Sequence, residues 1–268
     1  MEKFYSVEDG WFKLEHGLVN EGLIAIASGK GGVGKSTVTV NLALALVKLG
    51  KRVGIIDADI YGFSIPRIIG LTQKPRAYNQ KEIIPPEVSG VKVMSAGSMI
   101  EEDQAIIWRA PLLLGILEQF MKDVHWGELD YLLFDLPPGT GDMPLNIMQQ
   151  VSDAEILIVT TPQISATKVA CRVGEMAKQL DSNILGIIEN MSYYQCSDCK
   201  KKKYIFGQGG GQSMAKELKT ELLIQLPLIT NIREGSDQGK PVVLAKPEAE
   251  VSNKLFSLAE QIIAKGSN

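Results

Sequence analysis

One short segment constrains the fold of this chain more than any other: residues 29–36 read Gly-Lys-Gly-Gly-Val-Gly-Lys-Ser. In the pattern G-x-x-x-x-G-K-[ST], glycines let backbone N–H groups converge on phosphate oxygens. Such a loop needs a strand before it and a helix after it. Residues 23–28 form an apolar run typical of a buried strand, and residues 36–49 form a helix-like run closed by Gly50. The segment therefore predicts a phosphate-binding turn at a helix N-terminus.

The loop also carries the charges that a nucleotide site needs. Lys35 is expected to reach the β- and γ-phosphates, and the hydroxyl of Ser36 is expected to bind Mg²⁺. A second lysine, Lys30, follows the first glycine, which an ordinary phosphate loop does not require. The residues expected to surround the phosphates are Gly29, Lys30, Gly31, Gly32, Val33, Gly34, Lys35, Ser36 and Thr37.

Further apolar runs without polar alternation predict the rest of the sheet. They lie at residues 53–56, 91–94, 131–134, 156–159 and 184–188, and helix-length segments separate most of them. This arrangement is typical of a parallel sheet covered on both faces. We expect a doubly wound α/β fold with three α/β/α layers, in which a short N-terminal extension (1–22) precedes one ATPase domain (23–268).

Composition narrows the class of protein. With 268 residues and 45% apolar content the chain can form one large core. A net charge of −3 provides no overall basic field, so nucleic-acid binding is not expected. No apolar run is long enough to cross a membrane, and the amphipathic run at 251–264 is expected to pack on the sheet rather than on a lipid surface. We expect a cytoplasmic protein.

Carboxylates follow two of the predicted strands. Asp135 ends the run at 131–134, where a metal-binding Asp of a nucleotide site is expected to lie near Mg²⁺. Asp57 and Asp59 follow the run at 53–56 and can divide two tasks, with Asp57 towards the metal's water shell and Asp59 towards the attacking water. A helix-capping turn is the alternative for this pair.

Two cysteines, Cys196 and Cys199, lie in an expected insertion loop at about 191–211. Their spacing suits two thiolates on one metal or cluster, but two ligands do not complete a four-thiolate site. A symmetric dimer would supply four, for a [4Fe–4S] cluster or for Zn²⁺. Cys171 is expected in the core, and the two histidines, His16 and His125, lack ligand-spaced partners and are assigned no chemistry.

These segments together resemble those of the Mrp/ApbC-type iron–sulfur cluster carriers, a branch of the MinD/ParA class of ATPases with a deviant phosphate loop. The resemblance implies slow ATP hydrolysis, a homodimer in which Lys30 enters the partner's site, recognition of adenine by Asn190, and transfer of a cluster to apo iron–sulfur proteins. Asn190 is otherwise an ordinary turn residue. The matching segments are 28–37, 57–66, 135–142, 160–163, 190–192 and 196–199.

Two other functions fit parts of the same sequence. A positioning or partition ATPase like MinD or ParA, with a zinc-stapled dimer, would act on a membrane or DNA, but it does not explain the thiol pair. A reductase resembling the nitrogenase iron protein would hold its cluster cysteines beside the nucleotide-sensing loop, and residues 135–142 contain no cysteine. The cluster carrier therefore remains the leading hypothesis.

Overall fold

A single large sheet organises the computed structural model, which describes residues 5–8, 11–59, 62–79, 81–98, 110–196 and 198–266. In these residues the strand order is β14-β11-β10-β3-β9-β4-β8-β7. All neighbours from β14 to β8 are parallel, and β7 pairs antiparallel with β8. The bounds are β3 (Gly17–Ser28), β4 (Val53–Asp57), β7 (Glu87–Val88), β8 (Val91–Ser95), β9 (Gly127–Asp135), β10 (Glu155–Thr160), β11 (Ile184–Glu189) and β14 (Leu222–Gln225).

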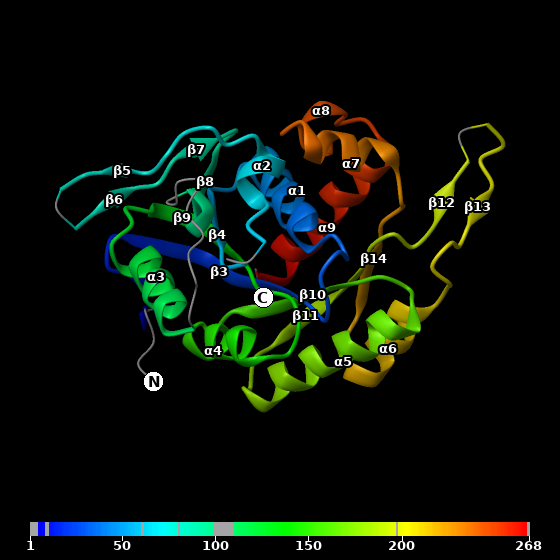
Figure 1. Cartoon of the computed structure of the whole chain (residues 1–268), viewed down its shortest axis with the longest axis horizontal. Helices are drawn as coiled ribbons and strands as arrows, with labels where there is room; N and C mark the ends of the chain where they lie inside the picture. The colour runs from blue at the N-terminus through cyan, green and yellow to red at the C-terminus, as the bar shows by residue number, and fades with distance from the viewer. Residues whose placement is uncertain are drawn as a thin grey trace.

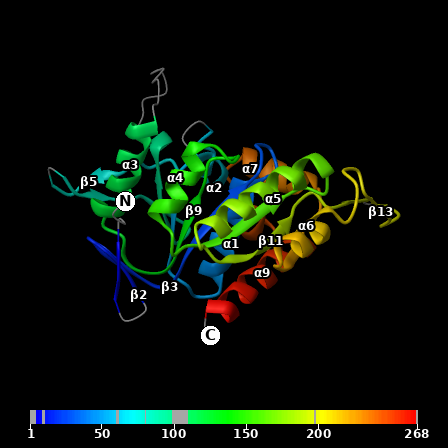
Figure 2. The same ribbon diagram turned by 90° about the horizontal axis from the view of Figure 1, so that it is seen from below.

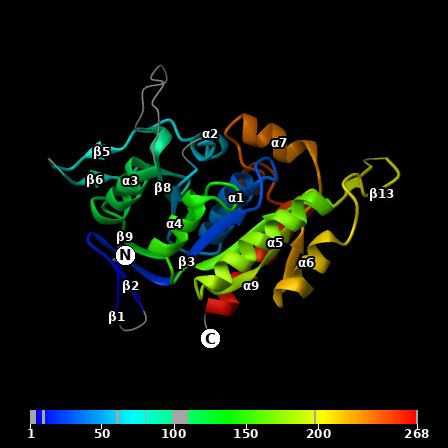
Figure 3. The ribbon, with the colours of Figure 1, turned by 60° about the horizontal axis from the view of Figure 1, so that its bottom comes forward.

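Helices cover both faces of this sheet (Figure 1). On one face lie α1 (Lys35–Lys48), α2 (Ile65–Ile69), α7 (Thr230–Asp237), α8 (Val242–Ala245) and α9 (Glu250–Gly266). The other face carries α3 (Ala110–Lys122), α4 (Asp142–Gln150), α5 (Ile164–Gln179) and α6 (Gly210–Leu218), and Figure 3 shows α3, α4 and α5 in front of the sheet. The expected doubly wound fold with three layers is confirmed.

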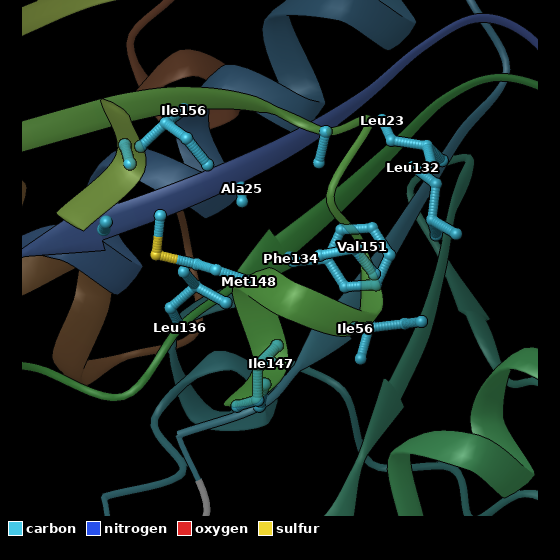
Figure 4. Packing of buried hydrophobic residues seen from close by; sticks show 14 of the residues in the cluster. Leu23, Ala25, Ile56, Leu132, Phe134, Leu136, Ile147, Met148, Val151 and Ile156 are labelled. Carbon is cyan, nitrogen blue, oxygen red and sulfur yellow. The ribbon is translucent and has the colours of Figure 1, made fainter. Parts of the chain in front are cut away.

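The central strand β3 shows why the apolar runs lacked alternation. Leu23 and Ala25 belong to the core under α4 and α5, whereas Ile24 and Ile26 belong to the core under α1. Both faces of the strand are therefore buried, as is typical of a parallel strand between two helical layers. Figure 4 shows the first of these cores, where Phe134 of β9 and Met148 of α4 lie among the labelled side chains.

The N-terminal part of the chain differs from the expected short extension. Strand β3 begins at Gly17 rather than at residue 23, and its first residues pair antiparallel with β2 (Trp11–Leu14), which pairs with β1 (Ser6–Glu8). The side chains of Leu14 and Val19 are buried. Burial of these apolar side chains accompanies the pairing, so residues assigned to the extension form part of the main sheet.

At the C-terminus, α9 confirms the amphipathic run at 251–264. Its buried residues include Val251, Leu255 and Leu258, which belong to the core shared with α1. The apolar face therefore packs on the protein, as expected. Among the described residues, no helix combines the length and apolar character needed to span a membrane.

Two short hairpins project from opposite ends of the long axis (Figure 1, Figure 2). One consists of β5 (Arg76–Ala77) and β6 (Ile83–Ile84), and the other of β12 (Tyr194–Gln195) and β13 (Lys202–Lys203). The second hairpin carries the two cysteines at 196 and 199, within the expected insertion loop.

Candidate nucleotide site and cysteine hairpin

The phosphate loop lies at the carboxyl end of β3 and leads directly into α1. Gly34, the residue before the helix, has φ +87°, which an L side chain rarely adopts. The first N–H groups of α1 have no partner within the helix, and they present positive partial charge at this end. Loop and helix thus form the anion cradle that the sequence predicts.

A cavity of about 840 Å³ opens above the loop. This volume falls within the range of small-molecule sites. Its other walls come from residues near the start of α2 and from the loop between β9 and α4. The lining residues are Ser28, Lys30, Gly31, Gly32, Val33, Gly34, Lys35, Ser36, Thr37, Asp59, Gly62, Ser64, Ile68, Pro137, Pro138, Gly141, Asp142, Met143 and Pro144.

Asp135, the last residue of β9, contacts the side chains at the end of the phosphate loop. Its carboxylate lies 2.7 Å from Nζ of Lys35 and accepts a hydrogen bond of 2.6 Å from the hydroxyl of Ser36. Thr39 donates to its other oxygen at 2.7 Å. The carboxylate is fully buried, and such a charge is tolerated because a cation and two hydroxyls satisfy it.

Thr39 was not among the sequence-predicted residues. It lies one helical turn after Lys35 and also donates to the Lys35 carbonyl at 3.1 Å. The i, i+4 spacing on a helix was a signal that could have found it. Thr39 thus holds the carboxylate that contacts both Lys35 and Ser36.

Sheet register brings the second carboxylate to the same place. Asp57 is paired with Asp135 on β9 and with Ser95 on β8. Ser95 donates to Asp57 Oδ2 at 2.9 Å. Burial, together with the charge of Asp135, raises the pKa of Asp57 to about 8 despite that hydrogen bond. A cation placed between these carboxylates would favour their ionised forms.

Asp59, the third carboxylate, faces the cavity. Its Oδ2 lies 3.5 Å from Nζ of Lys35, and its side chain is 13% exposed. Burial raises the pKa of Asp59, and the positive charge of Lys35 acts in the opposite direction. Asp57 and Asp59 thus occupy different environments, one inside the sheet and one at the cavity wall.

The second lysine of the loop, Lys30, lines the cavity as well. Its Nζ donates to Oε1 of Gln163 at 3.4 Å, just before α5. Gln163 lies in a segment that carried the family resemblance, but the sequence gave no reason to pair it with Lys30. The side chain of Lys30 is therefore held on the α5 side of the loop.

Asn190 lies behind the phosphate loop at the end of β11. Its side-chain amide donates to the Val33 carbonyl at 2.9 Å, and the side chain is buried. A Cβ on Gly34 would overlap this amide nitrogen. Asn190 thus holds the phosphate loop through the Val33 carbonyl. Its expected role in adenine recognition stays a prediction.

The residues around the phosphate loop suit Mg²⁺ and a nucleoside triphosphate. Magnesium prefers oxygen ligands, and the hydroxyl of Ser36 lies beside the buried carboxylate of Asp135. Added Cβ atoms at Gly31 and Gly32 would meet nothing within 4 Å, so the backbone there is open to a phosphate group. Ser36, Asp57 and Asp135 would hold the metal, which would neutralise charge on the phosphates.

The cysteine pair occupies the turn of the β12–β13 hairpin. Cys196 is half-buried and Cys199 is exposed. The backbone N–H groups of Cys199 and Asp198 approach the Cys196 sulfur and lower the pKa of its thiol. Lys200 closes the turn with φ +58°, and its N–H donates to the Cys196 carbonyl at 3.1 Å. Such a turn suits thiolate ligation.

The root of this hairpin is held by a buried carboxylate. Glu189 ends β11 and accepts hydrogen bonds from the hydroxyl of Ser192 at 2.8 Å and from the backbone N–H of Gly211 at 2.6 Å. Further out, Nζ of Lys202 lies 4.1 Å from the ring centroid of Tyr193. The ammonium group of Lys202 thus packs on an aromatic ring rather than being fully solvated.

Fold and site together define a P-loop nucleotide-binding protein. The ParA family model, described as NUBPL iron-transfer P-loop NTPase, matches residues 20–263. The chain belongs to this family.

Curated relatives carry one common name. An iron–sulfur cluster carrier protein from Synechocystis is 46% identical over 250 residues, which is 91% of this chain and 71% of the relative. A protein of the same name from Bacillus subtilis is 49% identical over 205 residues, or 76% of this chain. This chain spans only 58% of the length of that second relative.

Solved structures agree with the fold. A nucleotide-binding protein from Archaeoglobus fulgidus in complex with ADP has a TM-score of 0.74 at 40% identity, covering 86% of this chain and 90% of its own. The cell division ATPase MinD from Pyrococcus furiosus has a TM-score of 0.70 at 27% identity, covering 91% and 99%. The positioning-ATPase alternative is less supported, because its relatives are more distant than the cluster carriers.

Proposed function

We propose that this chain is an ATP-dependent iron–sulfur cluster carrier that holds a [4Fe–4S] cluster between two copies and passes it to apoproteins. One observation carries the proposal: an open cavity above a phosphate loop and a Cys-x-x-Cys turn with an exposed Cys199 occur in one chain. The names of the curated relatives support the cargo. The short separation of the two cysteines suits one metal centre, and a reducing compartment such as the cytoplasm would keep both thiols free.

The nucleotide step follows from the geometry of the cavity. The loop from Gly29 to Thr37 would bind the phosphates of ATP through backbone N–H groups, with Lys35 supplying positive charge. Nζ of Lys35 already lies near Asp135, Asp59 and the Ser36 hydroxyl. Since the amine has three donors, a phosphate oxygen would replace one of the two longer contacts, which are 3.5 Å to Asp59 and 3.4 Å to Ser36. Lys35 would then connect the phosphate to Asp135.

Hydrolysis would break the bond between the γ-phosphorus and the oxygen that leaves with ADP, as a water molecule adds to that phosphorus. Asp59 would orient this water and accept its proton, because its carboxylate faces the cavity. The products are ADP and inorganic phosphate. Bound Mg²⁺ would neutralise charge on the phosphate oxygens. Because turnover would be slow, hydrolysis would serve to change the geometry of the dimer.

Lys30 would act on the nucleotide of the partner subunit, and Asn190 would pair with the adenine. Lys30 lines the cavity, and its side chain is long enough to extend out of the cavity towards a second subunit. Its bond to Gln163 is long, at 3.4 Å, so little would be lost when the amine moves. Asn190 would have to share its amide between the Val33 carbonyl and the base.

The cluster would sit between the hairpins of two copies. Each chain offers two neighbouring thiols, and a [4Fe–4S] cluster takes four. Side chains that follow β13 at the base of this hairpin are exposed, with Tyr204 at 44% and Ile205 at 59%. An exposed apolar surface on the segment that carries the thiols would favour contact with a second copy or with an apoprotein.

Anaerobic reconstitution with iron and sulfide tests the cargo. Wild-type protein should approach one cluster per two chains and migrate as a dimer, as measured by iron and sulfide content and by Mössbauer spectra. The Cys196→Ser and Cys199→Ser variants should lose the cluster and retain ATP binding, while Cys171→Ser should retain both. A monomer that holds a full cluster, or zinc in place of iron after anaerobic isolation, would contradict the proposal.

Nucleotide binding is tested separately with Lys35→Ala. This variant removes the principal cation of the loop, a charge-assisted contact worth about 1.5–3 kcal/mol, so ATP affinity should fall by at least tenfold in calorimetric titration. Lys74→Ala provides a lysine control outside the cavity lining. Equal affinity in the wild type and the Lys35 variant would remove the phosphate-loop assignment.

The action of Lys30 across the interface is tested by mixing subunits. Lys30→Ala and Asp59→Asn should each reduce hydrolysis as homodimers. In a heterodimer both defects would fall in one composite site and leave the other intact, so activity should partly recover. No recovery, once heterodimers are demonstrated by mass spectrometry, would show that Lys30 acts within its own chain.

A further inference from the structure

The two histidines of the chain, to which the sequence assigned no chemistry, lie side by side in the structure. Their ring centroids are 4.6 Å apart, and the ring planes differ by 18°. Glu82 contacts both, with Oε1 at 3.9 Å from Nε2 of His16 and Oε2 in a short contact with Nε2 of His125. Sequence spacing gave His16 and His125 no ligand partners, because these residues and Glu82 converge only in the folded chain.

Backbone pairing fixes the three residues relative to one another. The His16 carbonyl accepts from the N–H of Gly127 at 3.2 Å, which ties the β2–β3 turn to the start of β9. The N–H of His125 donates to the Ile83 carbonyl at 2.9 Å, beside Glu82. Three segments far apart in sequence therefore bring their side chains to one place by main-chain contacts.

The cluster is reachable from solvent and separate from the nucleotide cavity. Its side chains are 26%, 25% and 35% exposed for His16, Glu82 and His125. None of them lines that cavity. Glu82 belongs to the β5–β6 hairpin, at the end of the molecule opposite the cysteine hairpin (Figure 1, Figure 2).

The donor set is that of a transition-metal site. One ligand atom from each residue can be chosen so that all three lie within 4.8 Å of one another, and within the described ranges this is the one such group of three or more His, Cys, Asp or Glu residues. Zinc binds imidazole nitrogen and carboxylate oxygen at about 2.0–2.2 Å in tetrahedral geometry, which places ligand atoms roughly 3.3 Å apart. Partly exposed side chains can close the remaining gap by small rotations.

We propose that His16, Glu82 and His125 bind a late first-row divalent cation, foremost Zn²⁺, with water in the fourth position. Two neutral imidazoles and one carboxylate favour such an ion over Mg²⁺ or Ca²⁺, which prefer oxygen ligands. The bound ion would cross-link the β2–β3 turn, the β5–β6 hairpin and the segment before β9. It would therefore stabilise the folded state in proportion to its free concentration.

A cobalt titration in a background that lacks the cysteine pair of the hairpin tests this site. Co²⁺ replaces Zn²⁺ in sites of this kind and gives visible d–d bands. The Cys196→Ser/Cys199→Ser background, with any affinity tag removed, excludes binding by the thiol pair of the hairpin, and the remaining Cys171 is buried in α5. We expect one Co²⁺ per chain, displaced by Zn²⁺. His16→Gln and Glu82→Gln should each weaken Co²⁺ binding by about tenfold or more, while Glu87→Gln, a carboxylate outside the cluster, should not.

Histidine NMR gives a second readout that does not depend on any variant. Since the chain has two histidines, its imidazole spectrum holds few signals, and stoichiometric Zn²⁺ should shift both sets together. Co²⁺ should broaden or shift the same signals. Unperturbed histidine signals in the presence of excess Zn²⁺, or Co²⁺ binding that survives in both His16→Gln and Glu82→Gln, would overturn the proposal.

Discussion

The phosphate loop and the cysteine hairpin differ in how far their functional side chains are buried. In the loop region, Lys35 is 6% exposed and Asp135 is fully buried, and each group has several partners. In the hairpin, Cys199 is exposed, and so are the side chains of Tyr204 and Ile205, which follow β13. A site that must hold charges in fixed geometry is surrounded by protein, whereas a surface that would exchange cargo with another protein must stay accessible.

This difference predicts how each region responds to mutation. Changes to the buried contacts around the loop should reduce both the free energy of unfolding and nucleotide binding, because the same contacts support both. Changes at the hairpin tip should leave the free energy of unfolding almost unchanged and affect only the cargo. The following predictions run from the largest expected effect on stability to the smallest.

Gly29→Ala should have the largest effect. A Cβ at Gly29 would overlap the backbone nitrogen of Ala170 in α5 and lie 2.6 Å from the carbonyl carbon of Val169. Because backbone cannot rotate away as a side chain can, we expect a loss of about 3 kcal/mol in the free energy of unfolding, measured with urea.

Gly31→Ala is the matched control within the same loop. A Cβ at this position would meet no atom within 4 Å, so its stability should change by less than about 0.5 kcal/mol. Equal losses for the two alanine variants would show that contact with α5 does not constrain the loop.

Thr39→Val should have an intermediate effect. The variant keeps the shape of the side chain but removes the donor to Asp135 Oδ1, which leaves part of a buried carboxylate without its partner. We expect a loss of about 1–3 kcal/mol by chemical denaturation and weaker ATP binding. Thr39→Ser, which keeps the hydroxyl, should lose less, and a serine variant as unstable as the valine variant would assign the effect to packing.

The smallest effect on the free energy of unfolding is expected at the hairpin. Cysteine-to-serine variants in the core and in the hairpin allow a direct comparison. Cys171 is buried in α5, and Cys171→Ser places a hydroxyl in the core at a cost of about 1 kcal/mol. Cys199→Ser exchanges one exposed group for another and should change the free energy of unfolding by less than about 0.5 kcal/mol. A larger loss at Cys199 than at Cys171, measured in metal-free buffer, would contradict the contrast between regions.

The sequence predicts the inner strands β3, β4, β8, β9, β10 and β11, because their apolar runs are continuous and mostly buried on both faces. The edge strand β14 is only partly buried, and it was not predicted. The loop motif places β3 and α1 together, and the run at 131–134 is confirmed as part of β9. The two-residue strands of the hairpins were not predicted. Their residues carry no periodic pattern, and their pairing depends on turns and on contacts with distant segments.

Partners of the site residues were harder to predict than the residues themselves. The motif predicts Lys35 and Ser36, but Ser95 becomes the partner of Asp57 only through the register of β8 against β4. Similarly, His16 and His125 meet only because β2, β3 and β9 are joined at one corner. Sequence spacing describes neighbours along one element, whereas these contacts depend on how elements are aligned.

The bond between Asn190 and Val33 has a mechanical consequence. From Asn190 the chain passes Ser192, whose N–H is bound to Leu226, and Tyr193, whose carbonyl is bound to Leu228, before it enters the hairpin. These bonds hold the base of the hairpin, and extended chain beyond them advances by about 3.3 Å per residue. In the proposed dimer, any tilt at this base would displace the cysteine turn more than the base itself, so the anchoring bonds limit how far the thiols of two copies could separate.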